Sequence, residues 1–514
     1  MDKKNNNLNG ENKVKRPPVV VVMGHIDHGK STLLDYIRKT NVVEKEAGGI
    51  TQKISAYEVL IEGEGKTEKI TFIDTPGHES FSKMRERGAR IADIAILIVS
   101  AEDGVKTQTV EAWKTIVDSK IPCIVAINKI DKPNANIEKT KTELAENEIY
   151  IENYGGKIPC AEISAKSGTG IDNLLALISI VAEMENFTGT ENTPASGFIL
   201  EANMDSKRGN QATLVIKNGT LKKGMFVIAE DSICSTNIIE NFQGKIVSEA
   251  TYSSPIRLIG FSKIPQIGAD FESFSNKKEA EKFMEEWKKE KENNKKPTQR
   301  ENTLTNSENK KIIPVILKAD ISGSLEAIEK EIKKIKNKGE IQNAEFKIIQ
   351  KGVGPVSESD IKSIGEESEV LVIGFNVKAD KNAEELSNKR NVSIHFFDII
   401  YKMTEWLEEE MENRRPKIET VETTGKAKVL KVFSRTKDKQ IIGAKTLNGR
   451  MVLDKIVKIL RRDFEIGKGK ILNLEKGKAK VKEVEEGAEF GMLLESKIEV
   501  VEGDIIESFN ITQR

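Results

Sequence analysis

The sequence is organised around Gly24-His25-Ile26-Asp27-His28-Gly29-Lys30-Ser31-Thr32. An apolar, β-branched run, Pro18–Met23, precedes this segment, and residues 33–38 after it place apolar side chains at helical spacing. A buried strand therefore leads into a glycine-bounded loop, and the loop opens a helix. This order of elements is the context in which such a loop binds phosphate.

The chemistry of the loop follows from its backbone and from two side chains. A helix N-terminus presents unpaired N–H groups and the positive end of the helix dipole. Gly24 and Gly29 let the backbone approach a phosphate closely because they carry no Cβ. Lys30 reaches the β- and γ-phosphate oxygens, and the Ser31 hydroxyl is a ligand for Mg²⁺. The alternative is a loop without function.

Length and composition restrict the class of protein. A chain of 514 residues exceeds one hydrophobic core, and roughly three to five domains are expected. The three cysteines and four histidines form no disulfide or zinc pattern. There is neither an apolar run of about 18 residues nor an apolar signal core at the N-terminus. We therefore expect a cytoplasmic protein that does not enter a membrane.

The net charge is zero, but the charges are unevenly distributed near the C-terminus. Residues 425–482 hold 18 Lys and Arg against 5 Asp and Glu, whereas residues 483–514 hold 2 against 9. A basic block in a globular segment favours contact with phosphate backbones, as in RNA or a ribonucleoprotein. A lysine-rich solvated surface is the alternative.

Apolar runs recur between helical or polar segments over Val19–Met23, Ile70–Ile73, Ile94–Val99 and Ile121–Ile127. This alternation predicts a largely parallel sheet with helices on both faces. Ligand chemistry is then expected in the loops at the carboxyl ends of the strands.

The first such loop after the phosphate loop is Asp74-Thr75-Pro76-Gly77-His78. A carboxylate at this strand end holds Mg²⁺ through water, and the Gly77 N–H faces a γ-phosphate and shifts when that phosphate leaves. The imidazole of His78 is positioned to orient or polarise an attacking water. The alternative for His78 is an exposed loop histidine.

Two later motifs predict the base. Asn128-Lys129-Ile130-Asp131 ends the strand over Ile121–Ile127, and an aspartate there accepts from both guanine donors, which adenine lacks. The Lys129 stem stacks over the base. Ser164-Ala165-Lys166 follows a short apolar run and offers backbone N–H groups to the guanine oxygen. GTP is therefore the expected nucleotide.

A further loop, Gly48-Gly49-Ile50-Thr51, lies between the first helix and the next strand. A flexible loop with a threonine closes over the γ-phosphate, ligates Mg²⁺ and loosens after hydrolysis. An ordinary glycine turn is the alternative.

Taken in order, these motifs resemble those of a translational GTPase. Their exact residues resemble those of bacterial translation initiation factor two. The resemblance is carried by Arg16–Val20, Glu46–Gln52, Gly77–Phe81 and Asp131–Pro133. It implies that His78 is catalytic and that Ile26 and Ile50 form an apolar gate beside it. Lys53 stands where the family has histidine, so altered contacts are expected there.

The expected site residues fall into three groups. Those that bind GTP are Gly24, His25, Ile26, Asp27, His28, Gly29, Lys30, Ser31, Thr32, Asp74, Thr75, Pro76, Gly77, Asn128, Lys129, Asp131, Ser164, Ala165 and Lys166. The switch residues are Gly49, Ile50, Thr51, Gln52 and Lys53. The Mg²⁺ ligands are Ser31, Thr51 and, through water, Asp74.

Composition and resemblance together predict a multi-domain chain of α/β and β units. Its expected parts are a disordered tail (1–16), a P-loop GTPase domain (17–187), a β-barrel (195–275), a charged helix and linker (276–310), a small α/β domain (311–397), a long connecting helix (398–418) and a C-terminal β-barrel (419–514). The apolar stripe of the charged helix is expected to dock rather than to bind a ligand.

The resemblance implies that the last barrel binds the formylmethionyl end of initiator tRNA. Candidate contacts are Glu489, Phe490 and Gly491. Ala444 and Phe490 stand where the family has cysteines, so an altered pocket is expected. The family's long N-terminal extension is not found before the loop, and weaker anchoring on the small ribosomal subunit is therefore a hypothesis.

The expected function is a monomeric, GTP-hydrolysing initiation factor that works with initiator tRNA and both ribosomal subunits. Two alternatives remain open. One is another translational GTPase that delivers tRNA. The other is a ribosome-binding protein that uses GTP as a ligand with little turnover.

Overall fold

The computed structural model describes residues 13–39, 51–63, 66–190, 192–294, 311–337, 344–365, 369–414, 419–477 and 479–513. The chain divides into two compact units, Met1–Arg414 and Arg415–Arg514. Within the described ranges, no helix combines the length and apolar character that crossing a membrane requires.

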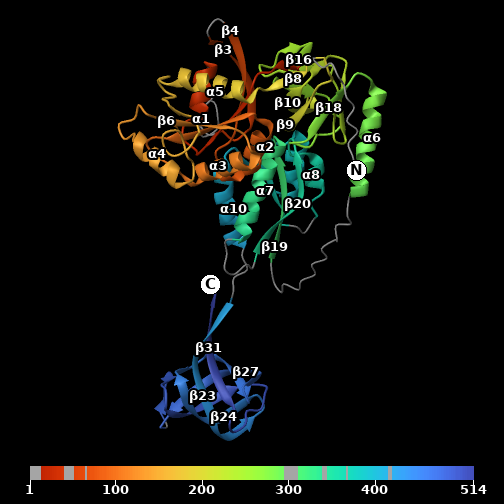
Figure 1. Ribbon diagram of the computed structural model, residues 1–514. Helices are drawn as coiled ribbons and strands as arrows, with labels where there is room; N and C mark the ends of the chain where they lie inside the picture. The colour runs from red at the N-terminus through yellow and green to blue at the C-terminus, as the bar shows by residue number, and fades with distance from the viewer. Residues whose placement is uncertain are drawn as a thin grey trace. The chain divides into compact units, whose positions relative to one another are not determined.

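The first domain, in the red-to-yellow part of Figure 1, is built on a six-stranded sheet in the order β3-β4-β2-β5-β6-β7. All neighbours are parallel except β3 and β4, which form a hairpin. The strands are β2 (Val19–Gly24), β3 (Ser55–Gly63), β4 (Lys66–Asp74), β5 (Ile94–Ser100), β6 (Cys123–Asn128) and β7 (Cys160–Glu162). The helices are α1 (Lys30–Arg38), α2 (Ser82–Ile91), α3 (Thr107–Ser119), α4 (Ile137–Glu146) and α5 (Ile171–Glu185).

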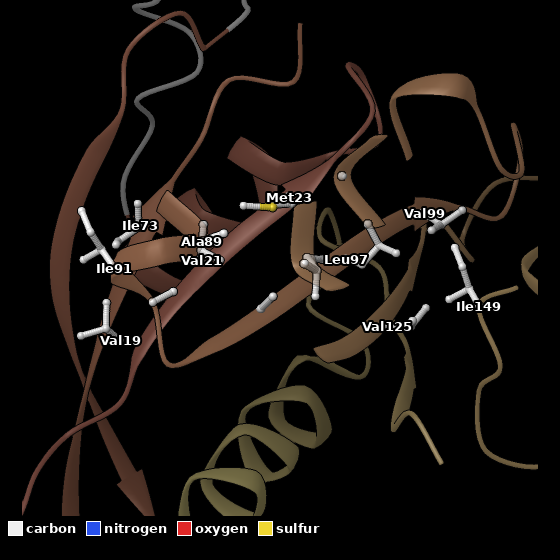
Figure 2. Packing of buried hydrophobic residues seen from close by; sticks show 14 of the residues in the cluster. Val19, Val21, Met23, Ile73, Ala89, Ile91, Leu97, Val99, Val125 and Ile149 are labelled. Atoms are coloured by element: carbon white, nitrogen blue, oxygen red, sulfur yellow. The ribbon is translucent and has the colours of Figure 1, made fainter. Parts of the chain in front are cut away.

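Both faces of this sheet are buried, which explains why β2 is apolar without alternation. Val19, Val21 and Met23 pack with α2, α3 and α4 on one face, and Figure 2 shows them with Ala89 and Ile91 of α2. Val20 and Val22 pack with α1 and α5 on the other. The parallel sheet with helices on both faces is therefore confirmed.

The expectation of a disordered tail is wrong for its last residues. Residues 13–15 form β1 (Lys13–Lys15), which pairs antiparallel with β8 (Thr188–Thr190). Arg16 then pairs with Asp93 at 2.6 and 2.7 Å. Short, charged edge strands carry no apolar alternation, so no periodic signal predicts this pairing. Residues 1–12 lie outside the described part.

The second domain is a β-domain with barrel-like sheets. Its main sheet has the order β13-β12-β18-β9-β10-β17-β14-β15, and β11 pairs with β16. The strands are β9 (Ser196–Asp205), β10 (Gly209–Asn218), β11 (Thr220–Lys222), β12 (Phe226–Ala229), β13 (Ser232–Ser235), β14 (Ile239–Asn241), β15 (Ile246–Val247), β16 (Glu249–Thr251), β17 (Pro255–Ile259) and β18 (Asp270–Phe274). The charged helix is α6 (Lys277–Asn294), and its apolar stripe docks on this domain, with the rings of Phe283 and Phe274 5.1 Å apart.

The third domain, β19 to α10, has a parallel sheet in the order β20-β19-β21-β22. Its elements are β19 (Lys311–Ala319), α7 (Ser322–Asn337), β20 (Ala344–Val353), α8 (Glu358–Lys362), β21 (Leu371–Phe375), α9 (Lys381–Arg390), β22 (Ile394–Phe397) and α10 (Ile400–Arg414). The helix expected over 398–418 is α10. Its Ile400, Met403 and Leu407 lie in the core of this domain, so its apolar stripe is used for packing there.

Glu201 lies on β9 where the first, second and third domains meet, and 8% of it is exposed. Its Oε1 accepts from the N–H groups of Ala202 (2.9 Å) and Gly323 (3.4 Å). Burial raises its pKa to about 7. Since the folded pKa exceeds the unfolded one, the stability from this group is present below about pH 4.5 and is lost as the pH rises toward 7.

We therefore expect Glu201→Gln to stabilise the protein at pH 8, by at most about 3 kcal/mol, and to have little effect near pH 4.5. The melting temperatures of the variant and the parent, measured across this pH range, test the expectation. Glu272→Gln, at an exposed position of the same domain, is the control. A gain that is the same at every pH would contradict it.

The C-terminal unit is a closed barrel. Its strands follow the order β26-β31-β23-β24-β30-β27, and β26 pairs with β27 to close it. They are β23 (Glu419–Thr436), β24 (Lys439–Gly449), β26 (Ile456–Arg461), β27 (Phe464–Lys476), β30 (Glu489–Glu495) and β31 (Ile505–Gln513), with the short β25 (Met451–Val452), β28 (Ala479–Lys480) and β29 (Glu483–Val484). The expected terminal barrel is thus confirmed as a fold.

Candidate functional site

The phosphate loop connects the end of β2 to the start of α1. Gly24 and Gly29 have φ angles of 145° and 88°, which disfavour residues with a side chain. A Cβ on Gly24 would collide with the Ile98 carbonyl, and one on Gly29 would collide with the Asn128 amide. Glycine is therefore required at both positions by conformation and by space.

Lys30 is folded into this loop. Its Nζ donates to the carbonyls of Gly24 (3.1 Å) and His25 (2.7 Å). Burial lowers its pKa to about 8, although the nearby Asp74 carboxylate opposes this shift. A Cβ on Gly77 would lie 2.6 Å from Nζ. The loop after β4 is thus packed directly against the phosphate loop.

The residues expected to hold Mg²⁺ come from three segments. The hydroxyls of Ser31 and Thr51 lie 2.7 Å apart, and Asp74 ends β4 with 5% of the residue exposed. Two hydroxyls and a carboxylate are the hard oxygen donors that suit Mg²⁺, whose remaining ligands are usually water and phosphate oxygens. These residues therefore fit the ion. Gly49 and Ile50 lie outside the described residues.

The expected base-binding motifs are joined by hydrogen bonds. Asn128 Nδ2 donates to the carbonyl of His28 (2.8 Å), and Asn128 Oδ1 accepts from the N–H of Ala165 (2.9 Å). Ser164 Oγ donates to Asp131 Oδ1 at 2.7 Å and lowers the pKa of that carboxyl. The Asp131 carboxylate is thus ionised and oriented before a base arrives. Asn128 links this pocket to the phosphate loop.

His78 is half-buried and precedes the short helix η3 (Glu79–Phe81). Its Nδ1 accepts from the N–H of Ser80 at 3.0 Å, and its ring meets the edge of Tyr401 at a centroid distance of 4.3 Å. Burial lowers its pKa to about 4. The imidazole is therefore neutral near pH 7, as a group that orients or polarises water must be.

The third domain contacts the site through residues that sequence reasoning missed. Gln52 Nε2 donates to the Asp398 carbonyl at 2.9 Å, and Lys53 pairs with Asp320. Ser80 Oγ donates to Glu331 of α7 at 2.6 Å. These partners lie hundreds of positions away in sequence, so no local pattern could reveal them. Lys53, which stands where the family has histidine, thus has a carboxylate partner.

The expected tRNA contacts do not share one surface. Phe490 is 5% exposed and lies in the barrel core, opposite Ala444 on β24. Glu489 is exposed and Gly491 partly exposed, because alternate residues of a strand face opposite sides. The Phe490 side chain therefore belongs to the barrel core, and contact of Glu489, Phe490 and Gly491 with the tRNA end stays a prediction.

Comparison with known proteins relates the whole chain to translation factors. Three family models match: the elongation factor Tu GTP binding domain over residues 15–184, elongation factor G domain 2 over 194–274 and translation-initiation factor 2 over 287–408. The chain is 40% identical to translation initiation factor IF-2 of Anoxybacillus flavithermus over 507 residues, which is 98% of this chain and 69% of that protein.

Two further similarities cover almost the whole chain. It is 39% identical to IF-2 of Caldanaerobacter subterraneus over 513 residues, covering 97% of this chain and 70% of that protein. A solved structure of GDP-bound aIF5B from Aeropyrum pernix covers 97% of this chain and 92% of its own, with 28% identity and a TM-score of 0.45.

Proposed function

Because the chain belongs to the translation initiation factor 2 family, we propose that this GTP-hydrolysing initiation factor brings formylmethionyl initiator tRNA to the small ribosomal subunit. It then promotes joining of the large subunit, and joining triggers hydrolysis. The protein acts as a monomer in the cytoplasm. The family and the GTPase domain over residues 15–184 support this assignment.

The observation that carries the GTP-dependent switch is the 2.7 Å contact between the hydroxyls of Ser31 and Thr51. Thr51, in the proposed switch segment, thus contacts the phosphate loop, although Ser31 and Thr51 are 20 positions apart in sequence. Ser31, Thr51 and Asp74 would hold Mg²⁺, which when bound neutralises charge between the β- and γ-phosphates. Asp131 and Lys129 select guanine.

The catalytic step is assigned to His78. Lys30 and the N–H groups at the start of α1 bind the phosphates, so the γ-phosphate comes next to Gly77, which packs on Lys30. The neutral imidazole of His78 then orients the attacking water. Loss of the γ-phosphate removes a partner of both Thr51 and Gly77. The switch segments loosen, and the factor leaves the ribosome.

The lowered pKa of His78 gives an expected pH profile. With a pKa of about 4, the imidazole stays neutral from about pH 7.5 down to about pH 5.5. Hydrolysis by the free factor at saturating GTP should change less than about 2-fold over this range, whereas an ordinary histidine would lose about 10-fold of its neutral form. Single-turnover rates test this, and an NMR titration of His78 reports its pKa directly. A midpoint near pH 6.5 would contradict the expectation.

The tRNA assignment is tested with the full chain and GTP. Equilibrium binding is measured with formylated and with unformylated initiator Met-tRNA, and deacylated tRNA serves as the control. We expect a clear preference for the formylated form. Equal binding of all three would remove formyl recognition from the proposed function. Light scattering of mixed ribosomal subunits, with and without the factor, then tests whether it accelerates joining.

A further inference from the structure

Arg85 is a cation in an almost completely buried position. Only 1% of it is exposed, and it heads the fully buried side chains of the described residues by volume. Burial lowers its pKa, and the carboxylate of Glu111 opposes this. Burying a guanidinium is costly unless it is paired and hydrogen-bonded. The hydrogen-bond partners of the Arg85 guanidinium therefore indicate the role of this buried charge.

Those hydrogen bonds converge on the loop that carries His78. Arg85 Nη1 donates to the carbonyls of Pro76 (3.4 Å), Gly77 (3.2 Å) and His78 (2.5 Å). Its Nη2 donates to Glu111 on α3 at 2.9 Å. One guanidinium thus fixes three consecutive peptide groups at the residue that is assigned to orient water, and an ion pair fixes the guanidinium.

The same helix also holds the phosphate loop. Gln108 Oε1 accepts from the N–H of Ile26 at 3.1 Å. Gln108 and Glu111 are three residues apart on α3 and therefore share one face. The two walls that face a γ-phosphate, the phosphate loop and the loop before His78, are thus tied to one rigid element.

The place of Arg85 in its own helix argues against a role in helix stability. It lies in the first turn of α2, where a cation opposes the helix dipole. An apolar side chain would fill this buried position without that conflict. We propose that Arg85, held by Glu111, is a positioning residue for His78, an inference that rests on the catalytic role proposed for that histidine.

The test compares Arg85→Lys with Arg87→Lys in the full chain, measuring ribosome-stimulated GTP hydrolysis. Lysine keeps the charge but cannot span three carbonyls and a carboxylate. Small displacements of a catalytic group cost up to about 100-fold in rate, so we expect kcat to fall by at least about 10-fold in Arg85→Lys. GTP affinity, measured separately, should stay within about 2-fold. Arg87 pairs with Glu326 at 2.7 Å and should tolerate lysine.

Two further variants separate positioning from general stability. Glu111→Gln keeps an acceptor for Arg85 without its charge, and it should lower kcat by less than Arg85→Lys with unchanged GTP affinity. In a His78→Ala background, Arg85→Lys should have almost no further effect on kcat, because residues that act as a unit are not additive.

An equal loss of kcat with and without His78, or no loss in either Arg85 or Glu111 variants, would overturn the proposal. If His78→Ala alone left stimulated hydrolysis unchanged, the role assigned to His78 would fail first, and this inference with it. Thermal unfolding of each variant shows whether a loss of rate only reflects a loss of folded protein.

Discussion

Asp131→Asn is expected to weaken GTP binding by about 100-fold or more. In the proposed site the carboxylate accepts from two guanine donors, and a hydrogen bond to a charged group contributes about 1.5–3 kcal/mol. Asparagine keeps one acceptor, so one bond remains, but its N–H₂ group faces the other guanine donor, so the second bond is replaced by repulsion. Ser164 Oγ already orients this carboxylate through a hydrogen bond of 2.7 Å. Ordering of the loop when the nucleotide binds will therefore not offset the loss of affinity.

The same variant should gain affinity for xanthosine triphosphate, which presents an acceptor where guanine presents its exocyclic amine. Equilibrium titration with both nucleotides measures the two effects together. Asp103→Asn is a matched control. Asp103 contacts Lys129 Nζ at 3.2 Å, so this substitution removes the same charge beside the pocket. Equal losses for both nucleotides in Asp131→Asn would mean that Asp131 does not read the base.

The nucleotide site could be predicted from sequence because each of its motifs consists of consecutive residues. A strand end, a glycine-bounded loop and a helix start are consecutive in the chain, and the parallel sheet brings the other motifs to the same edge. Gly24 and Gly29 illustrate this, because their φ angles and neighbours demand glycine. The links between motifs, such as Asn128 to His28 and Ala165, follow once the strand order is known.

The contacts with the third domain could not be predicted in this way. The bond between Gln52 and Asp398 spans 346 positions, and that between Ser80 and Glu331 spans 251. No periodicity connects such segments. Each of these polar residues, taken alone, is of a type that is common in exposed loops and helices. Arg85 did carry a weak signal, because it is a charge among apolar positions of α2, next to the buried Met84 and close to Gly88 and Ala89.

The C-terminal barrel shows a different limit. Resemblance predicted the fold, but alternation along β30 decides which side chains face outward, and it turns Phe490 inward with Met492 and Leu494. One residue of register separates a core position from a surface position. A sequence match to a family's binding residues therefore does not by itself place a substituted side chain on the binding surface.

His78→Ala is expected to lower ribosome-stimulated GTP hydrolysis by about 100- to 10,000-fold, the usual contribution of a positioned acid or base. GTP affinity should be nearly unchanged, because the proposed phosphate contacts come from Lys30 and the loop backbone. The ring's own contacts, with Ser80 and Tyr401, lie on the side of the third domain. Single-turnover hydrolysis on ribosomes gives the rate, and a fluorescent GTP analogue gives the affinity.

His395→Ala provides a matched control for this substitution. His395 is a histidine of the third domain whose ring packs on Trp406 at 4.3 Å, and it makes no described contact with the nucleotide motifs. Its loss should leave hydrolysis within about 2-fold of the parent. A rate that fell equally in both variants would indicate damage to the third domain, whereas an unchanged rate in His78→Ala would assign the activation of water to another group. A selective loss in His78→Ala would tie the chemistry to this imidazole, which contacts Tyr401 of the third domain and follows Gly77, the residue that packs on Lys30 of the phosphate loop.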